Sequence, residues 1–145
     1  MFEALTNRIK AGAQIETPWF SVHALSTTLP LPEAGSAVTV EHLALIHSSW
    51  RYPQKDKEFG RRMYAFNAII QGQDDVLDRV EYVKYLLHRS YPNPIQTTTD
   101  RVERFKLKEL AYGETELRAE VKIKDQDDLV CLARYINLTE TGSRL

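Results

Sequence analysis

The chain has a single cysteine, Cys131, among its 145 residues. One cysteine can form neither a disulfide within the chain nor a thiolate metal cluster. We expect Cys131 to be a small core residue, because unpaired cysteines behave as small hydrophobic groups. A role as nucleophile would need a base beside it, and the sequence indicates none.

Glycine-rich segments and long apolar runs are also missing. Gly60, Gly72 and Gly113 each stand alone, so the chain has no glycine-rich phosphate loop. No run approaches the roughly 18 apolar residues that a membrane-spanning helix needs. The first ten residues lack the basic segment and long apolar core of a secretory signal. We therefore expect a cytoplasmic protein with no membrane segment.

The chain has almost no excess of either charge, with 19 basic and 20 acidic residues. A net charge of −1 provides no field that would attract nucleic acid, so we expect none as a partner. One basic stretch lies between two predicted strands, and we interpret it as solvated loop charge or, alternatively, as a docking surface for an acidic partner or phosphate. Its residues are Arg51, Lys55, Lys57, Arg61 and Arg62.

Apolar and polar residues alternate along much of the chain, which predicts β-strands with one buried face. The alternation is strict over residues 116–124, and after the polar turn 125–128 an apolar strand returns over 129–138. These segments predict a β-hairpin. Six or more strands at roughly ten-residue spacing predict an all-β, two-sheet sandwich.

Other segments give further predictions. Residues 80–88 are apolar on both faces, which predicts a central strand, and Phe105 and Leu107 alternate with basic residues in a later strand. Residues 74–80 form either one helical turn capped by Asp74 or a plain loop.

Two histidines share a predicted strand near residue 45. His42 and His47 are five positions apart, which places them on opposite faces of that strand. We therefore expect no shared metal ion at these histidines.

The first 36 residues differ in character from the rest. Residues 4–13 predict a short helix, and residues 29–36 read as a linker with two prolines. Trp19, Phe20 and Val22 are expected to pack on the domain, because they would otherwise expose apolar surface. We divide the chain into an N-terminal extension (1–36), a sandwich domain (37–140) and a C-terminal tail (141–145).

The segment from Tyr85 to Pro94 combines a strand with a turn that two prolines stiffen. It presents His88, Ser90 and Tyr91 within four residues, which is typical of a rigid binding loop.

This loop resembles the His-x-Ser/Thr-aromatic-Pro-x-Pro signature of the YEATS domain family, in its prokaryotic branch. A second YEATS loop, Gly-Tyr/Trp-Gly/Ala, is matched by Ala111, Tyr112 and Gly113, with alanine where the family usually has glycine. Residues 64–70 resemble the family's tryptophan-containing strand, and the resemblance extends over residues 37–140.

The resemblance implies an immunoglobulin-like β-sandwich that binds acylated lysine or an extended peptide in an aromatic slot. Two tyrosine rings would form its walls, and the Ser90 hydroxyl and a backbone N–H near Tyr112 would hold the amide oxygen. His88 would orient Ser90 or line the floor. The candidate ligand-binding residues are His88, Ser90, Tyr91, Ala111, Tyr112 and Gly113.

The resemblance also implies a binding module and not an enzyme, with no catalytic residue, metal or cofactor. Its partner would be a protein or peptide, and relatives of this kind act as sensors or adaptors in prokaryotic signalling or immunity. The effector would then be a separate protein.

Two other hypotheses stay open from the residues alone. The sandwich could be an oligomerisation or adaptor scaffold in which Tyr91 and Tyr112 only pack. Ser90 and His88 could instead form a small hydrolase, although the sequence has no Gly-x-Ser-x-Gly elbow. An open slot would favour the binding module, a plugged slot would favour the scaffold, and a carboxylate on His88 would favour the hydrolase.

Overall fold

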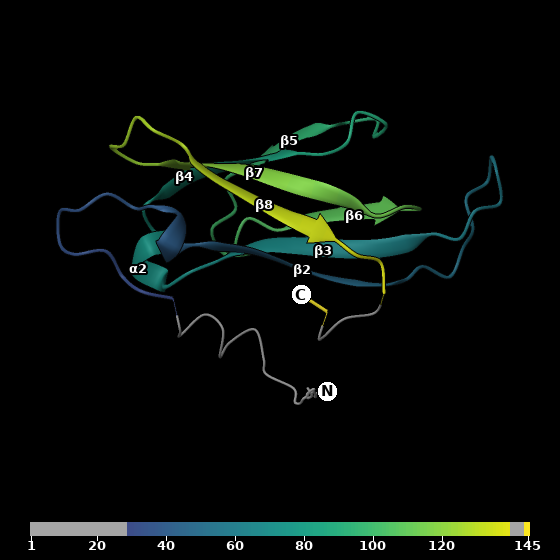
Figure 1. Ribbon diagram of the computed structural model, residues 1–145, viewed down its shortest axis with the longest axis horizontal. Helices are drawn as coiled ribbons and strands as arrows, with labels where there is room; N and C mark the ends of the chain where they lie inside the picture. Colours follow the sequence, from purple (N-terminus) through teal and green to yellow (C-terminus); the bar gives the residue numbers. More distant parts are fainter. Residues whose placement is uncertain (1–28, 140–143) are drawn as a thin grey trace.

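The computed structural model describes residues 29–139 and 144–145, and in them it forms two antiparallel sheets with little helix (Figure 1). The predicted sandwich is confirmed. The first sheet has the order β2 (Ala44–Arg51), β3 (Tyr64–Gln71), β6 (Leu107–Ala111). The second has the order β5 (Ile95–Thr98), β4 (Val80–Leu86), β7 (Thr115–Ile123), β8 (Val130–Ile136).

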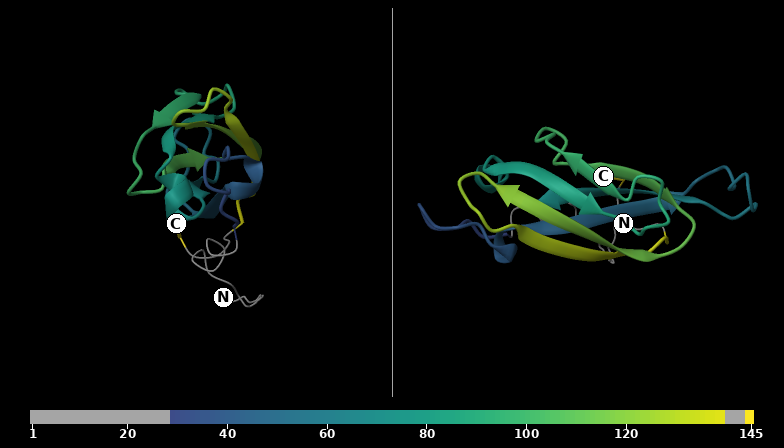
Figure 2. Two further views of the ribbon diagram at one scale, coloured as in Figure 1. Left: turned by 90° about the vertical axis from the view of Figure 1, so that its left-hand side faces the viewer. Right: turned by 90° about the horizontal axis from the view of Figure 1, so that it is seen from above.

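The core lies between the two sheets, which appear as separate layers when the molecule is seen end-on (Figure 2). The alternating residues of β7 that the sequence predicted are buried in this core, and β3 contributes three core residues from the opposite layer. Burial of this apolar surface is the main driving force for the sandwich. The residues concerned are Leu117, Ala119, Val121 and Ile123 on β7, and Phe66, Ala68 and Ile70 on β3.

The β7–β8 hairpin forms as predicted, and β4 lies centrally between β5 and β7. β4 is not buried on both faces, however. A register shift between Val80 and Tyr82 lets Val80 and Val83 both face the core, although they are three residues apart. The residues on the outer face of β4 are more exposed to solvent. On that face Lys84 forms an ion pair with Glu120 of β7 at 3.6 Å.

The prediction that His42 and His47 share a strand is wrong. The strand begins at Ala44, and His42 ends the short 3-10 helix η1 (Val40–His42). Its Nδ1 accepts a hydrogen bond from the Thr39 N–H at 2.9 Å, which caps the turn and diverts the chain from extended structure.

The strand predicted at residues 104–108 begins only at Leu107. Arg104 and Phe105 form a turn with φ of 55° and 57°, and Phe105 is fully buried. The predicted start of this strand was wrong because a buried residue in a turn gives the same sequence pattern as an inward-facing strand residue. The segment at residue 74 does form a helical turn, α2 (Asp74–Leu77), and its N-cap is Gln73 and not Asp74.

The prediction of a buried Cys131 is also wrong, because this residue is exposed. β8 is an edge strand whose core-facing residues include Val130 and Ile136. Cys131 is adjacent to Val130 and therefore points to the other face.

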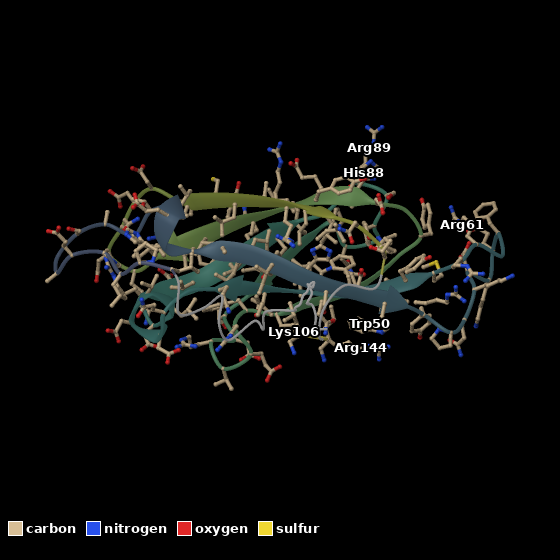
Figure 3. All side chains as sticks on the ribbon, turned by 60° about the horizontal axis from the view of Figure 1, so that its bottom comes forward. Trp50, Arg61, His88, Arg89, Lys106 and Arg144 are labelled. Atoms are coloured by element: carbon tan, nitrogen blue, oxygen red, sulfur yellow. The ribbon has the colours of Figure 1, made fainter. Side chains whose placement is uncertain are left out.

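The outer face of the three-stranded sheet carries the last described residues. Ser48 and Asn67 are cross-strand partners, and they bind the backbone N–H and carbonyl oxygen of Leu145 at 2.9 and 2.6 Å. The Arg144 guanidinium lies 4.5 Å from the centre of the Trp50 ring (Figure 3).

Part of the N-terminal extension lies outside the described residues. The predicted helix at 4–13 and the packing of Trp19, Phe20 and Val22 therefore stay predictions, as do the domain boundaries. No helix in the part of the chain that the structure describes is long and apolar enough to cross a membrane.

Candidate functional site

Three loops gather at one end of the sandwich, the right-hand end in Figure 1: β2–β3, β4–β5 and β6–β7. Between them lies a cavity of about 580 Å³. All six residues that the sequence singled out line it, from two loops about twenty residues apart in the chain. The structure therefore brings the candidate residues together, and their binding of a ligand stays a prediction.

Local hydrogen bonds shape the β4–β5 loop. The Leu87 N–H donates to the Pro94 carbonyl oxygen at 2.7 Å, which closes the loop at its base. The Tyr91 N–H donates to the His88 carbonyl oxygen at 3.0 Å, which closes a tight turn inside it. Because Pro92 follows directly, the backbone of Tyr91 is restricted on both sides. The ring of Tyr91 is thus presented to the cavity by a stiff loop.

His88 and Ser90 form a defined pair in this turn. The Ser90 backbone N–H points at His88 Nδ1 at 3.2 Å, and the Ser90 hydroxyl oxygen lies 2.9 Å from the same nitrogen. A backbone N–H can only donate, so Nδ1 is the unprotonated nitrogen of the imidazole and the hydroxyl also donates to it. The oxygen of Ser90 is left as an acceptor. This differs from our expectation that the hydroxyl would donate to an amide oxygen.

The two tyrosines differ in environment. Tyr112 is 51% exposed at the mouth of the cavity, whereas Tyr91 is half-buried. Burial, then the nearby charge of Glu109, then Tyr112 raise the pKa of the Tyr91 phenol to about 12. The Tyr91 hydroxyl therefore keeps its proton throughout the physiological range.

The β2–β3 loop contributes Arg61, from the basic stretch that the sequence indicated to be solvated loop charge or a docking surface. The Arg61 guanidinium carbon lies 3.6 Å from the centre of the Tyr112 ring and 4.7 Å from that of Phe59. Asp56 Oδ2 holds the guanidinium, with Nε and Nη2 both at 3.1 Å. Figure 3 shows Arg61 at the same end of the molecule as the three loops. The sequence could show that Arg61 lies in a basic stretch. It could not show that Arg61 stacks on Tyr112, because that contact depends on where β6 places Tyr112.

Two further carboxylates line the cavity and were not predicted. Glu109 Oε2 accepts a hydrogen bond from the Gln96 side chain of the opposite sheet at 2.6 Å. Glu114 accepts hydrogen bonds from the Tyr135 hydroxyl at 2.8 Å and the Leu138 N–H at 3.2 Å, which lower the pKa of Glu114. The alternation of residues 107–111 places Glu109 inward beside Leu107 and Ala111, and this was a usable signal.

Ala111, the residue that departs from the family motif, fits without backbone strain. It is the last residue of β6, pairs with Tyr64, and is buried. Among the described residues other than glycine, a positive φ occurs only at Arg104, Phe105 and Asp125. The backbone at Ala111 therefore does not require glycine. A Cβ at Gly113 would contact nothing within 4 Å, so this glycine also faces open space.

The geometry gives no support to the hydrolase hypothesis. Within the described ranges, no carboxylate bonds to the His88 imidazole, and a Ser-His pair needs such an orienting group. Residues 29–139 and 144–145 contain no group of three or more His, Cys, Asp or Glu side chains that could hold a metal ion.

Comparison with known families identifies the domain. The family model of the prokaryotic YEATS domain matches residues 64–137, which is just over half of the chain. The chain belongs to the prokaryotic YEATS family. The match runs from the first residue of β3 to just beyond β8 and contains both loops of the YEATS motif.

Solved YEATS domains share the fold. The crystal structure of the yeast AF-9 homologue Yaf9 superimposes with a TM-score of 0.54 at 16% identity, and the match covers 67% of this chain and 66% of that chain, just under two thirds. The Yaf9 YEATS domain bound to H3K27ac gives a TM-score of 0.54 at 17% identity, covering 68% and 74% of the two chains.

A third structure shows the Yaf9 YEATS domain recognising an H3K122suc peptide, with a TM-score of 0.53 at 16% identity, covering 72% and 80%. No curated protein matches the sequence significantly.

Proposed function

We propose that this YEATS domain is a non-enzymatic module that binds an acylated lysine of a protein or peptide in the cavity between Tyr91 and Tyr112. The observation that carries the proposal is the convergence of His88, Ser90, Tyr91 and Tyr112 on one open cavity. The Yaf9 YEATS domain has been solved bound to H3K27ac and recognising an H3K122suc peptide, and these acylated ligands of a relative support the class of ligand.

The polar groups fit a secondary amide. An acyl-lysine amide has one N–H donor and one carbonyl acceptor. The Ser90 oxygen is available to accept from the amide N–H, because its own hydrogen is directed to His88. A backbone N–H near Tyr112 would then donate to the acyl oxygen. The flat amide would lie against the tyrosine rings, where offset stacking contributes about 0.5–1.5 kcal/mol beyond burial.

Family membership also suggests a setting. We place the module in the cytoplasm, as a sensor or adaptor in a prokaryotic signalling or immunity system whose effector is a separate protein. The open cavity argues against the alternative of a pure scaffold, in which a side chain would fill the space between the loops.

The test is a titration of the ¹⁵N-labelled protein with matched peptides carrying acetyl-, crotonyl- or unmodified lysine. We expect the acylated peptides to shift the resonances of Tyr91 and Tyr112. Tyr112→Ala should weaken binding by about 5- to 150-fold, because loss of an aromatic hot spot costs about 1–3 kcal/mol.

The matched control is Tyr82→Ala, which removes a half-buried tyrosine of β4 that does not line the cavity. This variant should bind as the wild type does. If no acylated peptide shifts the loop resonances at millimolar concentration, the proposal is wrong.

A further inference from the structure

The cavity carries an excess of negative charge. Asp56, Glu109 and Glu114 line it, and Arg61 is the one arginine or lysine in the lining. Arg61 is already paired with Asp56. In the described part of the chain, Glu109 and Glu114 bond only to uncharged donors. Two carboxylates thus remain without a cation.

Glu109 is the carboxylate that lies deeper. Its strand β6 turns it inward, and the Gln96 side chain of the other sheet fixes its Oε2 at 2.6 Å. Its charge acts directly on the phenol of Tyr91. Glu114, in contrast, is exposed and is held at the rim by Tyr135 and Leu138. Because Glu109 lines the same cavity as Tyr91 and Tyr112, a ligand that contacts both rings is exposed to the charge of Glu109.

We propose that Glu109 makes this cavity selective for uncharged acyl groups on lysine and against acyl groups that end in a carboxylate. This inference rests on the proposed binding of acyl-lysine. A terminal carboxylate would meet the carboxylate of Glu109, and like charges at close range in a partly desolvated site repel. Arg61 does not offset this repulsion. Its charge is neutralised by Asp56, and the Tyr112 ring covers one face of its guanidinium group.

The experiment compares one peptide in two forms, butyryl-lysine and succinyl-lysine, which have acyl chains of similar length. At low salt we expect the wild type to bind the butyryl form about tenfold more tightly. Glu109→Gln should reduce this ratio to about twofold or less. Higher ionic strength should also narrow the ratio in the wild type, because salt screens charge repulsion at a solvent-connected site.

Glu116→Gln is the control. It makes the same change in net charge on an exposed residue that does not line the cavity, and its carboxylate pairs with Arg118 at 3.2 Å. The butyryl-to-succinyl ratio should stay as in the wild type.

Each outcome decides between the two proposals. If the wild type binds the succinyl form as tightly as the butyryl form, the selectivity is wrong while acyl-lysine binding stands. If the ratio is insensitive both to salt and to Glu109→Gln, shape and not charge sets it, and the role of Glu109 is wrong. If neither peptide binds at millimolar concentration, the proposed function itself fails. The salt series needs only the wild type, so the test does not depend on the folding of a variant.

Discussion

The buried hydroxyl of Tyr85 is predicted to hold the turn that precedes β6 and the second site loop. Tyr85 is 1% exposed, and its hydroxyl donates to the carbonyl oxygen of Phe105 at 2.6 Å. Burial raises the pKa of this phenol well above its ordinary value, so the hydroxyl stays a donor even at alkaline pH. Tyr85→Phe removes this one donor and keeps the shape of the ring.

The expected loss of stability in Tyr85→Phe comes from the Phe105 carbonyl oxygen, which loses its hydrogen-bond donor. Without the hydroxyl, a buried carbonyl oxygen loses its donor, which costs about 1–3 kcal/mol. No large cavity forms, because only one oxygen is removed. The turn is sensitive to this loss because Arg104 and Phe105 both have positive φ, which costs about 1–2 kcal/mol per residue. Two further bonds support it, from the Ile70 N–H to Arg104 at 3.0 Å and from the Phe105 N–H to Asp100 at 2.8 Å.

Urea unfolding provides the measurement. We expect Tyr85→Phe to lower the free energy of unfolding by about 2 kcal/mol through a lower midpoint with an unchanged m-value. Tyr82→Phe on the same strand is the control, since the Tyr82 hydroxyl bonds to no residue in the described ranges, and its cost should stay below about 0.5 kcal/mol. A loss at Tyr85 no larger than that of the control would refute the role of this hydrogen bond.

Two other predictions concern pH and a turn. Burial, then the charge of Arg134, lower the pKa of His47 below 6.5, against the raising effect of the Asn137 carbonyl. The unfolded chain then binds the proton more readily, so the stabilising contribution should be complete above pH 6.5 and be lost as the pH falls through the folded pKa. His47→Gln should flatten the pH dependence of the unfolding free energy just below pH 6.5, and an unchanged slope there would contradict this. Asp125 in the β7–β8 turn has a φ of 61°, so Asp125→Val should destabilise by about 1 kcal/mol or more in thermal unfolding, whereas Asp125→Gly should be tolerated; equal melting temperatures for the two variants would refute the strain argument.

Local pattern was sufficient for much of the fold. The alternation along residues 116–124 predicted β7 and its buried face, because a period of two is a property of each strand alone. The two prolines after Tyr91 predicted a stiff loop, because proline fixes its own φ whatever surrounds it. Pattern failed where a neighbouring element decides burial. Packing on the opposite sheet turns Val130 of β8 toward the core, so the adjacent Cys131 faces outward. Phe105 is buried in a turn that Tyr85 holds from the other sheet.

The candidate site divides in the same way. The sequence by itself singled out His88, Ser90, Tyr91 and Tyr112 as candidates, since their residue types and spacing lie within two short segments. Only the tertiary structure placed Arg61 on the Tyr112 ring and joined Glu109 to Gln96. Those contacts join separate loops or opposite sheets, and they depend on strand register and on how the two layers pack. The charge of the cavity, which the proposed selectivity depends on, was therefore decided by the fold and not by either loop.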